Sequence, residues 1–254
     1  MKAALARPLT HLAAALRFIT ILPAGPEDAY HPRAMIPYFP VVGLILGLIL
    51  AGVDAVCFAV MAPSVAGAVD VMVLAALTGA LHLDGLADTA DGLFSHRDRN
   101  TTLSIMKDSR IGVMGAVVLI IVLLTKFGGF CALPEHGSAG YERFLMLLLI
   151  PAYARCTMLA GVWRLPYARP AGGTAADLFG RPLQLGDFWG LGICVLLSLL
   201  LGWQGLLINL AFISACAGLI LFYRRRIGGI TGDMLGAMCE LTEAFLLICL
   251  AIRF

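Results

Sequence analysis

Long apolar stretches with few charges recur along the whole chain, and each is long enough to cross a lipid bilayer as a helix. Because an α-helix rises about 1.5 Å per residue, roughly 20 apolar residues span a hydrocarbon layer of about 30 Å. The fifth and sixth stretches are short and meet at Gln204 and Gly205, so these two could form one helical hairpin. The stretches predict about seven transmembrane helices, at residues 36–61, 65–83, 111–133, 143–163, 186–203, 205–222 and 235–252.

The N-terminal segment has a different pattern, in which Leu12, Leu16 and Ile19 recur at nearly helical spacing among polar positions. Arg17 interrupts this apolar face and Pro23 ends it, unlike a cleavable signal peptide. The pattern predicts an interfacial helix on the membrane surface, although an ordinary packed helix fits it equally well. The chain has no internal repeat and no low-complexity linker, so we interpret residues 1–254 as a single transmembrane domain of the all-α class.

The composition agrees with a polytopic integral membrane protein. Hydrophobic residues make up 60% of the 254 residues and charged residues 13%, against about 45–50% and about 25% in ordinary soluble domains. The mean hydropathy is +0.92. These values exclude a disordered chain, a disulfide scaffold and most soluble domains. No basic stripe with interleaved aromatic residues is present, so we expect no nucleic-acid partner.

The positive charges are distributed unevenly between the two sides of the predicted bundle. Fourteen of the 18 Lys and Arg residues fall in alternate connecting segments, at residues 1–35, 84–110, 164–185 and 223–234. Cytoplasmic loops of membrane proteins carry such an excess. The bias predicts that the N-terminus and these polar segments face the cytoplasm and that the C-terminus lies on the far side.

Three aspartates follow the second apolar stretch at a spacing that places them on one helix face. Asp84, Asp88 and Asp91 are separated by four and three residues, which leaves them within roughly 40° of one another around a helix. Carboxylates this close repel each other, and they suit a hard cation such as Mg²⁺, which often shares its ligand shell with substrate phosphates. The pattern predicts a metal site, with a solvated helix face as the simpler alternative.

Positive charge follows this acidic face in the sequence IMKDSRIG, residues 105–112. A site for a metal ion and a diphosphate needs both signs, because carboxylates hold the metal and basic side chains hold the phosphates. Lys107 and Arg110 are the candidates for phosphate, although anchoring at the cytoplasmic surface explains them equally well. His82 is a weaker candidate for substrate binding, since a lone histidine is more often a hydrogen-bonded structural residue.

A second acidic cluster begins at a glycine-rich turn that leads into the last apolar stretch. Backbone N–H groups at the start of a helix bind phosphate, so Thr231 and Asp233 are candidates for the site, although Asp233 could instead be a simple N-cap. Glu240 and Glu243 lie inside the apolar stretch. An ionisable residue there is costly and indicates a function by default.

Two basic residues lie within the apolar stretches. Arg155 is roughly 12 Å from the cytoplasmic end of its stretch, close to the depth of roughly 13 Å for Glu243. We therefore expect Arg155 to pair with one of the two glutamates or to reach a phosphate, with a purely structural ion pair as the alternative. Lys126 is expected to snorkel outward.

The motifs of the acidic segments resemble those of the cobalamin synthase family. The strings are HLDGLADTADG at 82–92, IMKDSRIG at 105–112 and GGITGDMLGA at 228–237. The resemblance covers nearly the whole chain. It implies an integral protein of the bacterial inner membrane that transfers the cobinamide-phosphate moiety of adenosylcobinamide-GDP to the 3′-hydroxyl of α-ribazole, or of its 5′-phosphate. GMP is released, and Mg²⁺ is the expected cofactor.

Residues and resemblance together give three sets of site residues. The candidate metal ligands are Asp84, Asp88, Asp91 and Asp233. The candidate catalytic residues are these four together with Glu240 and Glu243. The candidate substrate-binding residues are Lys107, Arg110, Arg155, Thr231 and His82.

Two other functions compete with this interpretation. A CDP-alcohol phosphotransferase also places an aspartate stripe at the cytoplasmic end of membrane helices, and a lipid product would favour it. A divalent cation transporter would use Glu240 and Glu243 as its ion path. The sequence leaves the oligomeric state open, including a homo-oligomer.

Overall fold

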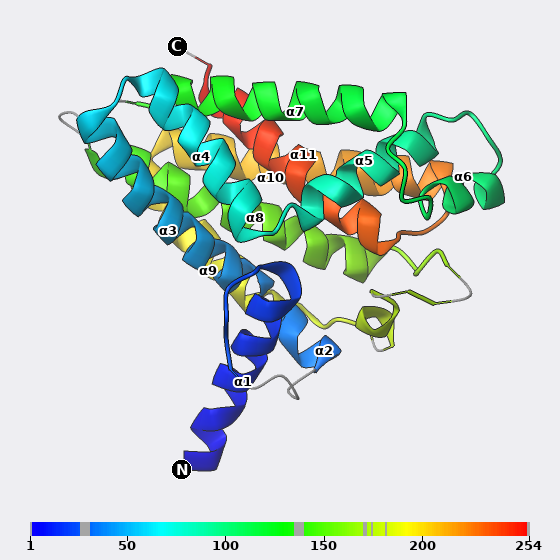
Figure 1. The fold of residues 1–254 in the computed structure, drawn as a ribbon. Helices are drawn as coiled ribbons and strands as arrows, with labels where there is room; N and C mark the ends of the chain where they lie inside the picture. The colour runs from blue at the N-terminus through cyan, green and yellow to red at the C-terminus, as the bar shows by residue number, and fades with distance from the viewer. Residues whose placement is uncertain are drawn as a thin grey trace.

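The computed structural model describes residues 2–25, 31–134, 140–169, 172–173, 175–180 and 182–252, and helices dominate them (Figure 1). The one β-type pairing in these ranges is a single parallel bridge between Tyr167 and Ile230. The longer helices are α1 (Lys2–Ile19), α3 (Phe39–Val60), α4 (Pro63–Leu77), α5 (Leu81–Leu93), α7 (Val113–Ala132), α8 (Gly140–Arg164), α9 (Trp189–Ser198), α10 (Trp203–Arg226) and α11 (Gly232–Leu250). The short ones are α2 (Pro32–Met35), η1 (Ile36–Tyr38), α6 (Arg99–Ile105), η2 (Ala176–Phe179), η3 (Leu185–Phe188) and η4 (Leu199–Leu201).

By length and composition, four helical segments are able to cross a membrane, at residues 32–60, 113–132, 141–164 and 203–226. They confirm an all-α polytopic membrane protein. The bent pair α4–α5 would add a fifth crossing if it is counted as one broken span. The number of crossings supported in the described part of the chain is therefore smaller than the seven expected from the sequence.

The expectation of one continuous helix over 65–83 is wrong. Gly79 and Ala80 have φ values of +59° and +58°, and these two left-handed residues interrupt the chain between α4 and α5. Glycine adopts this conformation without strain, whereas alanine does so at a cost of about 1–2 kcal/mol. The two helices meet at an angle of 89°. We count α5, with its three aspartates, outside the spanning helices.

The fifth and sixth apolar stretches form the helical hairpin that their short separation suggested. The first is interrupted, because α9 ends at Ser198 and a 3₁₀ turn follows it. Gly202 then reverses the chain with φ +58°, and α10 begins at Trp203, ahead of Gln204.

Helix α11 is the central element of the bundle, in contact with α5, α7, α8 and α10. In Figure 1 the C-terminus lies at the end where α3 turns into α4, and α6 lies at the opposite end. Helix α1 packs on α3 and buries Ala14, Ala15 and Ile19. Its second half is thus a packed helix, which was the alternative to a surface helix.

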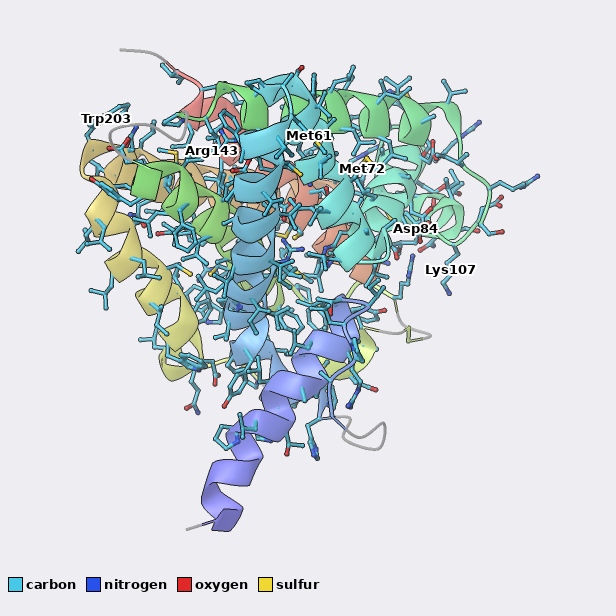
Figure 2. The ribbon with its side chains drawn as sticks, turned by 60° about the vertical axis from the view of Figure 1, so that its left-hand side comes forward. Met61, Met72, Asp84, Lys107, Arg143 and Trp203 are labelled. Carbon is cyan, nitrogen blue, oxygen red and sulfur yellow. The ribbon has the colours of Figure 1, made fainter. Side chains whose placement is uncertain are left out.

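A buried ion pair ties the end of the bundle opposite α6. Arg143 Nη2 lies 2.6 Å from Asp54 Oδ1 and 3.9 Å from Asp70 Oδ2. Figure 2 shows Arg143 well away from Asp84. This cluster joins α3, α4 and α8 and does not belong to the acidic site.

Candidate functional site

Helix α5 carries the three aspartates of the acidic stripe and lies against the first turns of α11. Gly85 permits this approach, because a Cβ atom there would lie 2.7 Å from the carbonyl oxygen of Asp233. One turn further along α11, a Cβ atom on Gly236 would lie 3.1 Å from the Cα atom of His82. As a result Asp84 and Asp233 line one small cavity, although they are far apart in the sequence.

Asp84 and Asp88 are the two carboxylates of the stripe that stay available to a ligand. Asp84 is exposed and Asp88 half-buried, and neither has a hydrogen bond or ion pair to any other described residue. Burial, followed by the negative charges of Asp84 and Asp233, raises the pKa of Asp88 from 3.8 to about 6. A cation at this position would offset the repulsion that disfavours the ionised form.

Asp91 lies on the same face of α5, but both oxygens of its carboxylate already accept hydrogen bonds from backbone N–H groups. The N–H of Gly112 lies 2.7 Å from Oδ2 and that of Gly115 lies 2.8 Å from Oδ1. Both N–H groups belong to the start of α7, where an anion is stabilised by unpaired backbone donors and by the helix dipole. Asp91 therefore joins α5 to α7.

Asp233 is paired with a residue that the sequence pattern did not single out. Arg169 Nη2 lies 2.5 Å from Asp233 Oδ2, and the Thr231 hydroxyl donates to the same oxygen at 3.3 Å. Thr231 caps α11, since its hydroxyl accepts a hydrogen bond from the N–H of Met234 at 3.2 Å. The alternative role of Asp233 as a simple N-cap is therefore wrong.

The pairing of Arg169 with Asp233 follows from the packing of two loops. The backbone N–H of Ala168 donates to the carbonyl oxygen of Ile230 at 2.9 Å, and the N–H of Ile230 donates to the carbonyl oxygen of Pro166 at 2.9 Å. Arg99 joins the two loops. Its Nη2 donates to the carbonyl oxygen of Ala168 at 2.7 Å, and its Nε donates to the carbonyl oxygen of Ile227 at 2.8 Å. No spacing in the sequence connects residues so far apart, so only the charge of Arg169 could have drawn attention to it.

The two basic candidates of the 105–112 segment differ in their availability. Lys107 is exposed and without a partner among the described residues, and Figure 2 shows it at the same end of the molecule as Asp84. Arg110 is also exposed, but its Nη2 lies 2.6 Å from Asp108 Oδ2. Hydrogen bonds from Arg110 lower the pKa of Asp108 to about 2. Lys107 is thus the freer cation of the two.

The two glutamates of α11 lie in a buried network of charges below the stripe. Lys126 Nζ lies 2.9 Å from Glu240 Oε2 and 2.5 Å from Glu243 Oε2. Arg155 also pairs with Glu243, which confirms the pairing expected from their depths. The expectation that Lys126 snorkels outward is wrong, because its side chain is 3% exposed and its ammonium group neutralises the two carboxylates. An ionisable residue within an apolar stretch was the signal for it, as it was for the glutamates.

His82 connects this network to the cavity beside Asp84. Arg155 Nη2 lies 3.4 Å from His82 Nδ1, and a guanidinium group only donates, so Nδ1 is the acceptor and the proton resides on Nε2. His82 is 1% exposed, and its Nε2 has no hydrogen-bond partner in the part of the chain described. With Asp84 and Asp233 it lines a cavity of about 90 Å³.

The site offers a small set of oxygen donors for a metal ion. Among the described residues, no three His, Cys, Asp or Glu side chains converge as ligands of one ion. Asp84 and Asp88 are free, and Asp233 has one oxygen outside its pair with Arg169. Mg²⁺ is usually held by one or two carboxylates, water and substrate phosphates, so this set fits Mg²⁺ that arrives with a diphosphate.

Comparison with known proteins decides the family. The family model described as CobS, Cobalamin-5-phosphate synthase, matches residues 11–251. The chain belongs to the CobS family. An adenosylcobinamide-GDP ribazoletransferase of Roseiflexus sp. (strain RS-1) is 39% identical over 96% of this chain and 90% of its own length. One of Pseudomonas paraeruginosa is 40% identical over 96% of this chain and 98% of its own. No solved structure matches. The acidic stripe and the glycine-rich turn both lie within the matched part of this CobS chain.

Proposed function

We propose that this CobS protein is an adenosylcobinamide-GDP ribazoletransferase that carries out the last step of nucleotide loop assembly. The 3′-hydroxyl oxygen of α-ribazole, or of its 5′-phosphate, attacks the phosphorus atom that is esterified to cobinamide. The phosphoanhydride bond to GMP breaks, GMP leaves with the electron pair of that bond, and the hydroxyl proton passes to a carboxylate of the site. The products are adenosylcobalamin, or its 5′-phosphate, and GMP.

The observation that carries this proposal is the pair of unpartnered carboxylates, Asp84 and Asp88, beside the Arg169–Asp233 ion pair. Phosphoryl transfer requires positioning and charge neutralisation more than covalent chemistry from the protein. Asp84, Asp88 and Asp233 would hold Mg²⁺, which neutralises the diphosphate when bound. Asp91 keeps α5 in place through its bonds to α7.

Basic side chains at the rim would hold the phosphates. Lys107 is exposed and free to fold towards the stripe, and Arg169 is already in the site. Arg110 is 2.6 Å from Asp108 and would have to exchange that partner. Charge-assisted hydrogen bonds of this kind are about twice as strong as neutral ones.

The buried network acts on the substrate through His82. Lys126 pairs with both Glu240 and Glu243, and Glu243 also pairs with Arg155. Arg155 in turn contacts His82 Nδ1 and so favours the tautomer with its proton on Nε2. His82 can then donate its Nε2 proton to a phosphate or ribose oxygen. Glu240 and Glu243 are positioning residues in this proposal. Because Lys126 and Arg155 pair with them, neither carboxylate is free to form the ion path of a transporter.

We place the site on the cytoplasmic face of the inner membrane. The loops around the stripe carry most of the basic residues, and Arg224, Arg225 and Arg226 end α10 on the same side. Cytoplasmic loops have this excess of Lys and Arg.

The proposal is tested with purified protein in lipid vesicles, supplied with adenosylcobinamide-GDP and α-ribazole with and without Mg²⁺. We expect GMP release only with both substrates and Mg²⁺. Asp88→Asn should lower the rate by at least about 100-fold, since it removes a metal ligand worth several kcal/mol. Asp187→Asn is the matched control, because Asp187 is an acidic residue that lines a different cavity. A fully active Asp88→Asn protein would refute the role of the stripe, and a lipid product would favour a CDP-alcohol phosphotransferase.

A further inference from the structure

Helices α9 and α10 form a hairpin that is closed at one end and open at the other. At the closed end Gly205 packs against the last turn of α9, where a Cβ atom would lie 1.8 Å from the carbonyl oxygen of Ser198. Asn209 Nδ2 also donates to Ser198 Oγ at 2.8 Å. Towards their other ends the helices separate, and α8 forms the floor between them.

The opening is an apolar groove of about 580 Å³. Its lining from α8 includes Ala160 and Trp163, and its opposite walls include Leu191 of α9 and Phe212, Ala217 and Ile220 of α10. Ile213 and Leu221 of α10, which also line the groove, are 60% and 47% exposed, as is typical of apolar side chains that contact lipid chains. The groove is therefore open to the hydrocarbon layer.

Two arginines lie at the wide end of the groove. Arg164 ends α8 and its guanidinium group lies 4.9 Å from the ring centroid of Trp163. Arg224 donates to the carbonyl oxygen of Arg164 at 3.1 Å. Neither has a carboxylate partner among the described residues. Asp187, the acidic residue of the neighbouring segment, lines a different cavity with Arg33.

The length of the groove matches one leaflet of a bilayer. Its lining on α10 extends from Phe212 to Arg224, which is about 18 Å at about 1.5 Å per residue. Half of a hydrocarbon core is about 15 Å thick. An acyl chain lying along α10 would thus place its headgroup at the level of Arg164 and Arg224.

We propose that this groove is a binding site for an anionic phospholipid, with an acyl chain against α8 and α10 and the phosphate on Arg164 and Arg224. The two guanidinium groups, which have no carboxylate partner among the described residues, complement a phosphate, and basic pockets between membrane helices bind anionic headgroups. A zwitterionic lipid would cancel part of this attraction through its own ammonium group. None of the residues proposed for the transferase site lines the groove, so the two sites are independent.

The test compares phosphatidylglycerol and phosphatidylcholine retained by the detergent-purified full chain in native mass spectrometry. We expect preferential retention of phosphatidylglycerol, reduced by at least about tenfold in the double variant Arg164→Gln/Arg224→Gln. Arg225→Gln is the matched control, because Arg225 ends the same helix but does not line the groove. Ala217→Trp fills the groove while keeping both arginines and should lower retention as well.

Equal retention of the two lipids by the unaltered protein would overturn the proposal. So would a double variant that keeps its phosphatidylglycerol, or an Arg225→Gln protein that loses as much. If inorganic phosphate displaced the lipid completely, the arginines would be an ion site without the groove. A lipid-free dimer that the Ala217→Trp change separates would identify a second copy of the chain as the occupant and would also refute a lipid site.

Discussion

Arg169, in the loop after α8, forms an ion pair with Asp233 in the first turn of α11, 64 residues away in the sequence, with 2.5 Å between Nη2 and Oδ2. The pair places one positive charge at the edge of a group of three aspartates, of which Asp84 and Asp88 have no partner. Asp233 is therefore held in position before any ligand arrives. A diphosphate with its metal could take over either partner of this pair.

Loss of the Arg169 charge should weaken substrate binding and turnover. Arg169→Gln leaves Asp233 as an uncompensated negative charge beside Asp84 and Asp88, and this charge repels a diphosphate. We expect kcat/KM for GMP release to fall by at least about tenfold, which is about 1.4 kcal/mol. Arg169→Lys should recover part of the loss. Arg225→Gln serves as the control, and an unchanged kcat/KM in Arg169→Gln would contradict the role of the pair.

Magnesium should stabilise the protein through Asp84 and Asp88. A ligand that binds only the folded state adds RT ln(1 + [L]/Kd), about 2.7 kcal/mol at 100 times Kd. We expect Mg²⁺ to raise the midpoint of thermal unfolding of the purified protein by roughly 2–4 °C per kcal/mol. The double variant Asp84→Asn/Asp88→Asn should lose this rise. The same increase in both proteins would show that Mg²⁺ binds elsewhere.

The class of fold could be predicted from the sequence because membrane crossing depends on local composition. The apolar stretches at 111–133 and 143–163 agree closely with α7 and α8. The break after Leu77 could not be predicted, since Gly79 lies within an apolar run and the left-handed conformation of Ala80 depends on its surroundings. Mean hydropathy is averaged over a window of many residues, so a change of backbone direction at one or two apolar residues does not alter it.

The site was predicted as far as its chemistry is local. The spacing of Asp84, Asp88 and Asp91 follows from one helix, and the structure brings Asp233 to it. What each oxygen contacts depends on neighbouring elements: α7 takes both oxygens of Asp91. The prediction for Lys126 is wrong because snorkelling assumes a lipid-facing side chain, whereas α7 turns this residue towards α11.

The close approach of α5 and α11 should be sensitive to a single methyl group at Gly85. In Gly85→Ala the new Cβ atom would lie 2.7 Å from the backbone of Asp233, so the two helices must separate. We expect GMP release to fall by at least about tenfold, since misplacement of about 1 Å can cost up to about 100-fold. Gly52→Ala is the control, because nothing lies within 4 Å of that position. Similar rates for both variants would show that α5 need not touch α11.

The charge of Lys126 should matter for stability far more than that of the exposed Lys107. Lys126→Met leaves Glu240 and Glu243 buried, with only Arg155 to compensate two carboxylates. Removing one partner of a buried ion pair typically costs about 3–5 kcal/mol in the free energy of unfolding. Unfolding of the purified protein by increasing SDS in mixed micelles measures this difference.

Lys107→Met is the matched control and should unfold like the unaltered protein, because Lys107 has no partner among the described residues. The double variant Lys126→Met/Glu240→Gln should regain part of the lost stability, since it removes one of the uncompensated charges. If Lys126→Met alone unfolded like the control, the network would not hold α7 against α11.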